Sequence, residues 1–137
     1  MVHFGDRLKI KIQLMCGEAV ALGPGKADLL SAISTAGSIS GAARAMGMSY
    51  RRAWQMVDLM NRCWHAPLVE TSPGRAQGGG ARLTEAGLAV LGGYRKLQTT
   101  LNGQAANDEL DDLTKWLRPR PLRNQSDRRV EDDKAGS

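Results

Sequence analysis

Apolar and polar residues alternate strictly over residues 7–14, where the apolar positions are Leu8, Ile10, Ile12 and Leu14. A period of two is typical of a β-strand with one buried face. Cys16-Gly17 can then form a tight turn, and residues 18–22 would return as a short partner strand. Gly23-Pro24-Gly25 is expected to stop any regular element. The chain is therefore predicted to begin with a β-hairpin.

Three segments with helical spacing of apolar residues follow the hairpin. The first helix is expected over residues 26–36, and Gly37 is placed to end it in a left-handed conformation. Ser38 is a suitable N-cap for a second, short helix, which Gly47 ends in the same way. Ser49 then caps a third helix. The pattern predicts three consecutive helices with a glycine at each of the two turns between them.

The third helix has an apolar side and a polar, mostly basic side. Its apolar side is formed by Tyr50, Ala53, Trp54, Met56, Val57 and Met60. Its polar side is formed by Arg51, Arg52, Gln55, Asp58 and Arg62. Because Trp54 belongs to the apolar side, we expect it to be a core anchor, and we expect the same of Trp64 near the helix end. Pro67 closes this segment.

Residues 68–83 begin and end with short strand-like pieces and contain Pro73 and the triple glycine 78–80. This composition predicts a hairpin with a long, mobile tip. Thr84 then caps a final helix, in which the spacing of a coiled-coil seam is found at Val90, Tyr94, Leu97 and Leu101. A seam of this kind needs a partner helix.

Three glycines interrupt this last helix, at Gly87, Gly92 and Gly93. A glycine in a helix interior costs up to about 1 kcal/mol relative to alanine. Packing in a dimer would have to offset that loss.

The composition changes to charge and proline after about residue 106. We therefore expect a folded domain over residues 1–106 and a charged, largely disordered tail over residues 107–137. Residues 108–117 can form a helical turn or two with Trp116 as their bulky anchor. Residues 120–137 have too little apolar content to fold alone and are expected to be disordered.

Charge is distributed unevenly along the chain. Residues 1–103 contain twelve basic and six acidic side chains, whereas residues 104–137 contain seven and eight. A small basic domain is attracted to polyanions such as nucleic acids. No stretch approaches the roughly 20 apolar residues that cross a bilayer, and the N-terminus does not resemble an export signal. We expect no membrane partner and a cytoplasmic location.

Cys16 and Cys63 are the only cysteines, and in a reducing compartment they are expected to be buried thiols. A zinc site would need four ligands to converge from separate parts of the chain. We therefore assign no metal and no cofactor. Paired carboxylates in a cleft, a catalytic triad and a phosphate-binding loop are not recognisable either, so we do not expect an enzyme.

Two short helices joined by a glycine turn, with a small residue at their crossing, are the components of a helix-turn-helix. Ala43 permits the close approach, and Gly47 takes the positive φ of the turn. Arg51 and Arg52 lie at the start of the following helix, where a recognition helix meets base edges in the major groove. Arginine matches both guanine and phosphate, so the role of each arginine stays open.

A plain helical hairpin with solvated arginines would fit the same segment. The glycine-rich hairpin that follows favours DNA binding, because Arg75 and Gln77 at its tip and Arg82 on its returning strand would lie against backbone or minor groove. Residues 40–82 contain six arginines and two acidic side chains. The sequence therefore predicts a mainly α fold with small β-hairpins: a winged helix-turn-helix with a long C-terminal dimerisation helix.

Several motifs in this region resemble a known family. They are GSIS-x-AA from Gly37, MSY-x-x-AW from Met48, MN from Met60, the glycine-rich wing and LTEAG from Leu83. Together they resemble the N-terminal winged helix-turn-helix domain of ModE-type molybdate-responsive transcriptional regulators, which is itself similar to the DNA-binding domain of LysR-type regulators. The resemblance covers about residues 7–103.

The resemblance implies a homodimeric regulator that binds a roughly palindromic operator in double-stranded DNA. The residues expected to contact DNA are Ser38, Ser49, Tyr50, Arg51, Arg52, Gln55, Arg75, Gln77 and Arg82. Family members dimerise through N-terminal strands and the last helix, and the corresponding residues here are Leu8, Ile10, Ile12, Val90, Tyr94, Leu97 and Leu101.

Residues 104–137 are too few for the family's C-terminal molybdate-binding domains. Molybdate binding is therefore not assigned, and a separate effector-binding protein becomes a candidate partner. The alternative hypothesis is a winged-helix protein-interaction module that acts with another regulator or with a molybdenum-handling protein. Salt dependence and sequence dependence of DNA binding separate the two hypotheses.

Overall fold

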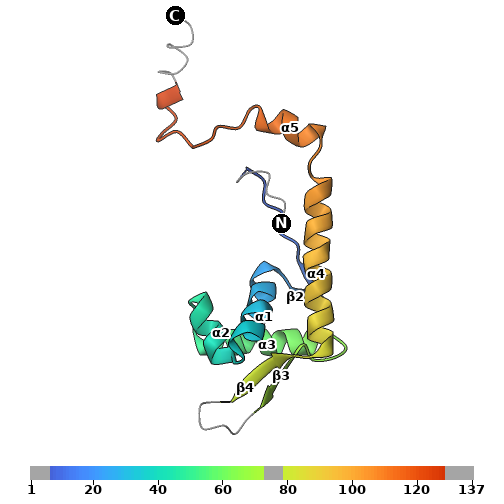
Figure 1. Ribbon diagram of the computed structural model, residues 1–137. Coiled ribbons are helices and arrows are strands. Elements are labelled where there is room, and N and C mark those ends of the chain that lie inside the picture. The colour runs from blue at the N-terminus through green and yellow to red at the C-terminus, as the bar shows by residue number, and fades with distance from the viewer. Residues whose placement is uncertain (1–6, 73–78, 129–137) are drawn as a thin grey trace, which may run out of the picture. The chain divides into compact units, whose positions relative to one another are not determined.

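The computed structural model describes residues 7–72 and 79–128 (Figure 1). Its elements are β1 (Leu14–Cys16), β2 (Ala19–Leu22), α1 (Pro24–Ala36), α2 (Ile39–Met46), α3 (Tyr50–Cys63), β3 (Val69–Ser72), β4 (Gly80–Leu83), α4 (Glu85–Gln104) and α5 (Asp108–Thr114). The chain divides into two units, Met1–Gly103 and Gln104–Ser137. The first unit has the expected fold, mainly helical with two small antiparallel hairpins.

Helices α1, α2 and α3 surround the core of the first unit, and their ends are those that the sequence predicts. Gly37 and Gly47 have φ values of 73° and 66°, which are left-handed helix stops. The hydroxyls of Ser38 and Ser49 accept from the backbone N–H of the third residue beyond, as N-caps do. The largest fully buried side chains are Leu22, Leu29, Leu30, Ile33, Met60 and Leu68.

The start of α1 corrects one expectation. Pro24 and Gly25 do not lie in a break between elements, because α1 begins at Pro24. Proline is tolerated in the first helical turn, where its missing N–H would have no partner in any case. The helix is therefore two residues longer than the apolar spacing indicates.

The expected strand over residues 7–14 is mostly wrong. Of this segment only Leu14 belongs to β1, whose three residues pair with Leu22, Val20 and Ala19 of β2. Residues 8–13 have no strand partner within the described part of the chain, and a strand without a partner leaves its backbone groups unpaired. The alternation persists in their exposure, since Leu8, Ile10 and Ile12 are half-buried while the intervening residues are exposed.

The two cysteines are less buried than expected. Cys16 is exposed on β1, and Cys63 is half-buried at the end of α3. Burial and a hydrogen bond with Cys16 raise the pKa of the Cys63 thiol. Among residues 7–72 and 79–128, no group of three or more histidine, cysteine or acidic side chains is placed to hold a metal ion.

Helix α4 starts against the wing at a very close contact. Thr84 caps it by accepting from the Gly87 N–H at 2.9 Å, and its hydroxyl donates to the Pro67 carbonyl at 2.6 Å. A Cβ at Gly87 would lie 2.1 Å from the Leu68 carbonyl oxygen. Glycine is therefore required here by the approach of two backbones, whereas a Cβ at Gly92 or Gly93 would meet only open space.

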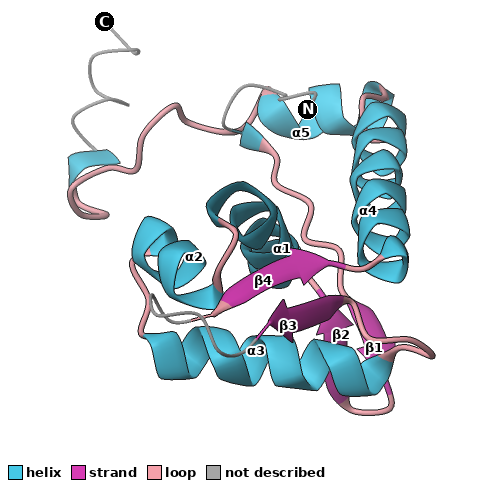
Figure 2. Cartoon of the chain, turned by 60° about the horizontal axis from the view of Figure 1, so that its bottom comes forward, coloured by secondary structure: helices cyan, strands magenta, loops and turns pink. Residues whose placement is uncertain are grey.

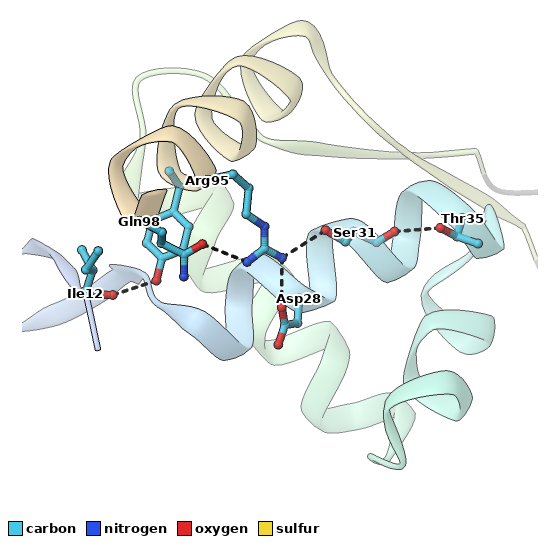
Figure 3. Close-up of polar contacts among 7 residues, drawn as sticks. Ile12, Asp28, Ser31, Thr35, Arg95 and Gln98 are labelled. Carbon is cyan, nitrogen blue, oxygen red and sulfur yellow. Dashed lines mark hydrogen bonds and ion pairs between the residues drawn. The ribbon is translucent and has the colours of Figure 1, made fainter. Parts of the chain in front are cut away.

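Polar contacts attach the middle of α4 to α1 and to the N-terminal segment. Figure 3 shows Arg95 of α4 reaching Asp28 and Ser31 of α1, and the Arg95–Asp28 ion pair measures 2.9 Å. The Tyr94 hydroxyl donates to the Ile12 carbonyl at 2.8 Å. Tyr94 is only 2% exposed, so it belongs to the core of its own chain, contrary to its expected place in a seam that faces a partner.

The second unit contains the expected short helix, α5, which Asn107 caps through the Leu110 N–H. Trp116 does not anchor it, since this side chain is 89% exposed. Residues 120–126 form bends and a turn, residues 127 and 128 are helical, and residues 129–137 lie outside the described ranges. Within the described ranges, no helix combines the length and the apolar character that crossing a membrane would require.

Candidate nucleic-acid interface

Helix α3 is held by its apolar side and presents its first turns to solvent. Ala53, Val57 and Met60 are buried. The Ser49 hydroxyl accepts from the Arg52 N–H at 3.1 Å and fixes the first turn. Figure 2 shows α3 with α2 near one end and the wing strands alongside it. The exposed part of α3 is therefore its N-terminal half, next to the turn from α2.

Arg51 and Arg52 lie in that first turn and are exposed. Neither has an acidic partner among the residues that the structure describes, and the first turn contains no acidic residue. Positive side chains at a helix N-terminus are opposed by the helix dipole. The two guanidinium groups and the helix N-terminus thus form a concentrated positive end, which attracts anions.

The remaining candidates on the helices lie around this end. Tyr50 and Gln55 are exposed on α3. Ser49 is exposed at its N-cap, and Ser38 is half-buried at the N-cap of α2, where its hydroxyl accepts from the Gly41 N–H at 3.0 Å. Five of the predicted DNA contacts, from Ser49 to Gln55, are therefore exposed at the N-terminal end of α3, while Ser38 is at the start of the neighbouring helix.

The wing candidates are placed only in part. Arg75 and Gln77 lie outside the described residues. Arg82 is on β4, directly opposite Glu70 of β3, and the two side chains form an ion pair of 2.9 Å. Such an exposed pair is worth about 1 kcal/mol at most. Arg82 can therefore exchange Glu70 for a phosphate at small energetic cost.

The base of the wing is tied to the helix-turn-helix at two points. The Asn61 side chain accepts from the N–H groups of Leu68 and Val69 at 2.9 and 3.1 Å, and donates to the Val69 carbonyl at 3.0 Å. The Ala81 N–H donates to the carbonyl of Gly37, at the end of α1, at 2.8 Å. The sequence marks Asn61 only as part of a motif, and its role at the base of the wing becomes visible in the structure.

Trp54 is not the core anchor that its place on the apolar side of the helix predicts. It is 49% exposed, whereas Trp64 is half-buried and its indole N–H donates to the Ala21 carbonyl at 3.3 Å. The available signal was the helical angle, because Trp54 lies one turn after Tyr50 and away from the stripe formed by Ala53 and Val57. Trp54 therefore lies beside the basic residues and outside the core.

The candidate dimerisation residues form two groups. Leu8, Ile10 and Ile12 are half-buried along the N-terminal segment. On α4, Val90 and Leu101 are half-buried and Leu97 is 37% exposed, while Tyr94 is buried as described above. Apart from Tyr94, these side chains keep apolar surface that their own chain does not cover.

Comparison with known proteins shows what this chain is similar to. Residues 26–88 match the family described as "Bacterial regulatory helix-turn-helix protein, lysR family". The molybdenum-pterin-binding protein MopA of Rhodobacter capsulatus is 42% identical over 66% of this chain and 34% of its own length. The molybdenum transport protein ModE of Azotobacter vinelandii is 36% identical over 77% of this chain and 38% of its own.

A third relative is the DNA-binding transcriptional dual regulator ModE of Escherichia coli, 35% identical over 61% of this chain and 32% of its own length. The chain thus spans about a third of the length of these relatives. The matched region contains α1, α2, α3, the wing and the start of α4. Residues 26–88 are therefore similar to the helix-turn-helix domain of the lysR family of bacterial regulators, and the N-terminal part of the chain resembles ModE-type regulators.

Proposed function

We propose that this chain is a sequence-specific, DNA-binding transcriptional regulator that acts as a homodimer on a roughly palindromic operator. The observation that carries the proposal is the start of α3, where Arg51, Arg52 and Gln55 are exposed around a helix N-terminus. Neither arginine has an acidic partner in the described part of the chain. The match of residues 26–88 to a regulatory helix-turn-helix family supports the same conclusion.

In the proposed mechanism, α3 enters the major groove with its first turns against the base edges. Each arginine donates either to guanine or to phosphate, and Gln55 can pair with adenine. The hydroxyls of Ser38 and Ser49 keep a proton that they can donate to phosphate oxygens, because their caps use only the acceptor side. Arg82, released from Glu70, adds a contact to the flanking backbone, as do Arg75 and Gln77.

The homodimer is part of this proposal. Two recognition helices about 34 Å apart would reach successive major grooves on one side of the duplex. The partly exposed apolar residues of the N-terminal segment and of α4, Leu97 above all, supply the surface for pairing. The relatives named above carry molybdenum in their names or act as regulators. In our proposal, a response to molybdate would come from a separate effector-binding protein.

Fluorescence-anisotropy binding to a randomised duplex pool, followed by selection of the tightest binders at two salt concentrations, tests the proposal. We expect one palindromic sequence to retain preference at the higher salt. Arg51→Ala and Arg52→Ala are expected to weaken binding unevenly across variants of the selected duplex, by about 10-fold or more at the base that each arginine reads.

A contrary result is equally clear. Binding that falls to the same low level for all duplexes at the higher salt would show that the arginines answer only to phosphate. The chain would then be a winged-helix interaction module rather than a sequence-specific regulator.

A further inference from the structure

An exposed aromatic pair borders the basic residues of α3. Tyr50 is 55% exposed and Trp54 is 49% exposed, although the other aromatic residue of the first unit's helices, Tyr94, is 2% exposed. The indole N–H of Trp54 has no hydrogen-bond partner among the described residues, in contrast to that of Trp64. A large apolar surface left uncovered on a small domain commonly marks a binding surface.

The helical geometry of α3 places this pair beside the DNA-reading residues. Tyr50 and Trp54 are four residues apart, so they lie one above the other on the helix surface. Arg51 and Gln55 form a parallel stripe next to them by the same spacing. Asn61, seven residues after Trp54, is on the aromatic stripe and binds the base of the wing. The aromatic stripe therefore lies on the side of the basic stripe that faces the wing.

The major groove displays one apolar group, which is the C5 methyl of thymine. Guanine, cytosine and adenine present only polar groups there, which the guanidinium of Arg51 and the amide of Gln55 match. The indole N–H of Trp54 could donate to one such acceptor, but its apolar ring surface matches none of them. An indole in the groove without an apolar partner would lose its contact with water and gain little. The chemistry of the uncovered surface thus points to a methyl group.

We propose that Trp54, with Tyr50 beside it, recognises the C5 methyl of a thymine in each operator half-site, next to the bases that Arg51 and Gln55 read. The inference rests on the proposed function and adds a specificity-determining residue to it. It requires that the ring contact the methyl group in the groove. Stacking on an unpaired base or packing against the wing would give a different result in the test.

The test removes the methyl group and nothing else. Each thymine of the selected duplex is replaced singly by deoxyuridine, which keeps the base pair and its O4 acceptor. We expect at least one position per half-site at which the replacement weakens wild-type binding by about four-fold, the effect of one buried methyl. At the remaining thymines we expect changes below about 1.5-fold.

Variants assign the effect to the side chain. With Trp54→Ala, the thymine and deoxyuridine duplexes should bind within about 1.5-fold of each other at the sensitive position, whereas Arg51→Ala should weaken both and keep the four-fold ratio. Trp54→Leu retains apolar surface and should keep part of the ratio. Thermal unfolding of each variant serves as the control for folding, and half-exposed Trp54 should tolerate these changes.

The inference fails if wild-type protein binds its selected duplex specifically but no deoxyuridine replacement matters, because the proposed function would then stand without this contact. It also fails if Trp54→Ala keeps the four-fold ratio. If no duplex is selected at all, the proposed function is wrong, and the inference that rests on it is wrong as well. Only a methyl effect that depends on Trp54 supports the inference.

Discussion

Arg52 shows at the scale of one residue how anion binding and stability conflict. It is the third residue of α3, and its N–H donates to the hydroxyl of Ser49. Glutamate at this position would complete a capping box with Ser49 and would interact favourably with the helix dipole, whereas arginine is opposed by it.

We therefore predict that Arg52→Glu raises the free energy of unfolding by about 0.5–1 kcal/mol and weakens DNA binding by more than about 10-fold. Urea denaturation and anisotropy measure the two effects, with Arg52→Ala as the control that removes charge without adding a cap. A less stable glutamate variant would contradict the predicted capping box with Ser49, and a variant that keeps its DNA affinity would contradict the assignment of Arg52 to an anion-facing position.

Two glycines of α4 make a matched pair at the same scale. A Cβ at Gly87 would overlap the Leu68 carbonyl, whereas Gly93 is exposed with open space around it. We predict that Gly87→Ala destabilises the fold by about 1–3 kcal/mol through this clash. Gly93→Ala should stabilise it by up to about 1 kcal/mol, because alanine is the better helix former. Chemical denaturation of both variants checks the contrast, and equal effects would be inconsistent with the close contact at Leu68.

The sequence predicts the role of a residue well where that role depends on local chain geometry. It predicts burial poorly, because burial depends on which parts of the fold pack around the side chain. The caps at Ser38, Ser49, Gly37 and Gly47 are predictable because a cap depends on the residue itself and on its position next to a helix. The apolar character of Trp54, grouped with the apolar side of the helix, predicts a core position. Its angle on α3, away from the stripe of Ala53 and Val57, places it on the surface instead, and residue type alone carries no information about that angle.

At the scale of elements, helices were predictable and the first strand was not. A helix satisfies its own backbone hydrogen bonds, so its pattern and caps are sufficient evidence. A strand needs a partner, and the alternation over residues 8–13 reports a buried face without reporting what pairs with the backbone. The close contact between Gly87 and Leu68 is also not predictable from the sequence, which indicates only that a glycine at this position weakens the helix.

Tyr94 joins two elements and gives a prediction that depends on pH. Its hydroxyl donates to the Ile12 carbonyl at 2.8 Å, and burial, the largest cause, raises its pKa above the usual 10.0. Because the folded state favours the neutral phenol, this stability is fully present below about pH 10 and is lost as the pH rises through the higher folded value.

Replacement of Tyr94 by phenylalanine separates the hydrogen bond from the packing. We predict that Tyr94→Phe lowers the free energy of unfolding by about 1 kcal/mol near neutral pH. It should also remove the part of the alkaline loss of stability that belongs to this group. Urea denaturation between pH 7 and pH 11 measures both effects, and an unchanged alkaline loss would assign it to other groups.

For the whole molecule, the exposed leucines of α4 decide whether two copies can pair. Leu97 and Leu88 are both exposed on α4, at 37% and 58%, but only Leu97 has the spacing of the predicted seam. We predict that Leu97→Asp weakens self-association by more than about 10-fold, because a charge would be buried without a partner. Leu88→Asp is the matched control and should leave association unchanged. Sedimentation equilibrium measures both, and equal effects, or a wild type that is monomeric at all concentrations, would exclude the seam.

The contact between Gly87 and Leu68 has a consequence for how such a pair would read DNA. Two backbones that touch directly have no side chain between them that could reorient, so α4 leaves the wing in a set direction. Asn61 in turn fixes the wing to α3. In a dimer joined through α4, the distance between the two recognition helices would therefore be fixed by the fold of each copy and would already be set before DNA binds. An operator with one base pair inserted between its half-sites would have to bend or twist to fit, because the protein could not stretch.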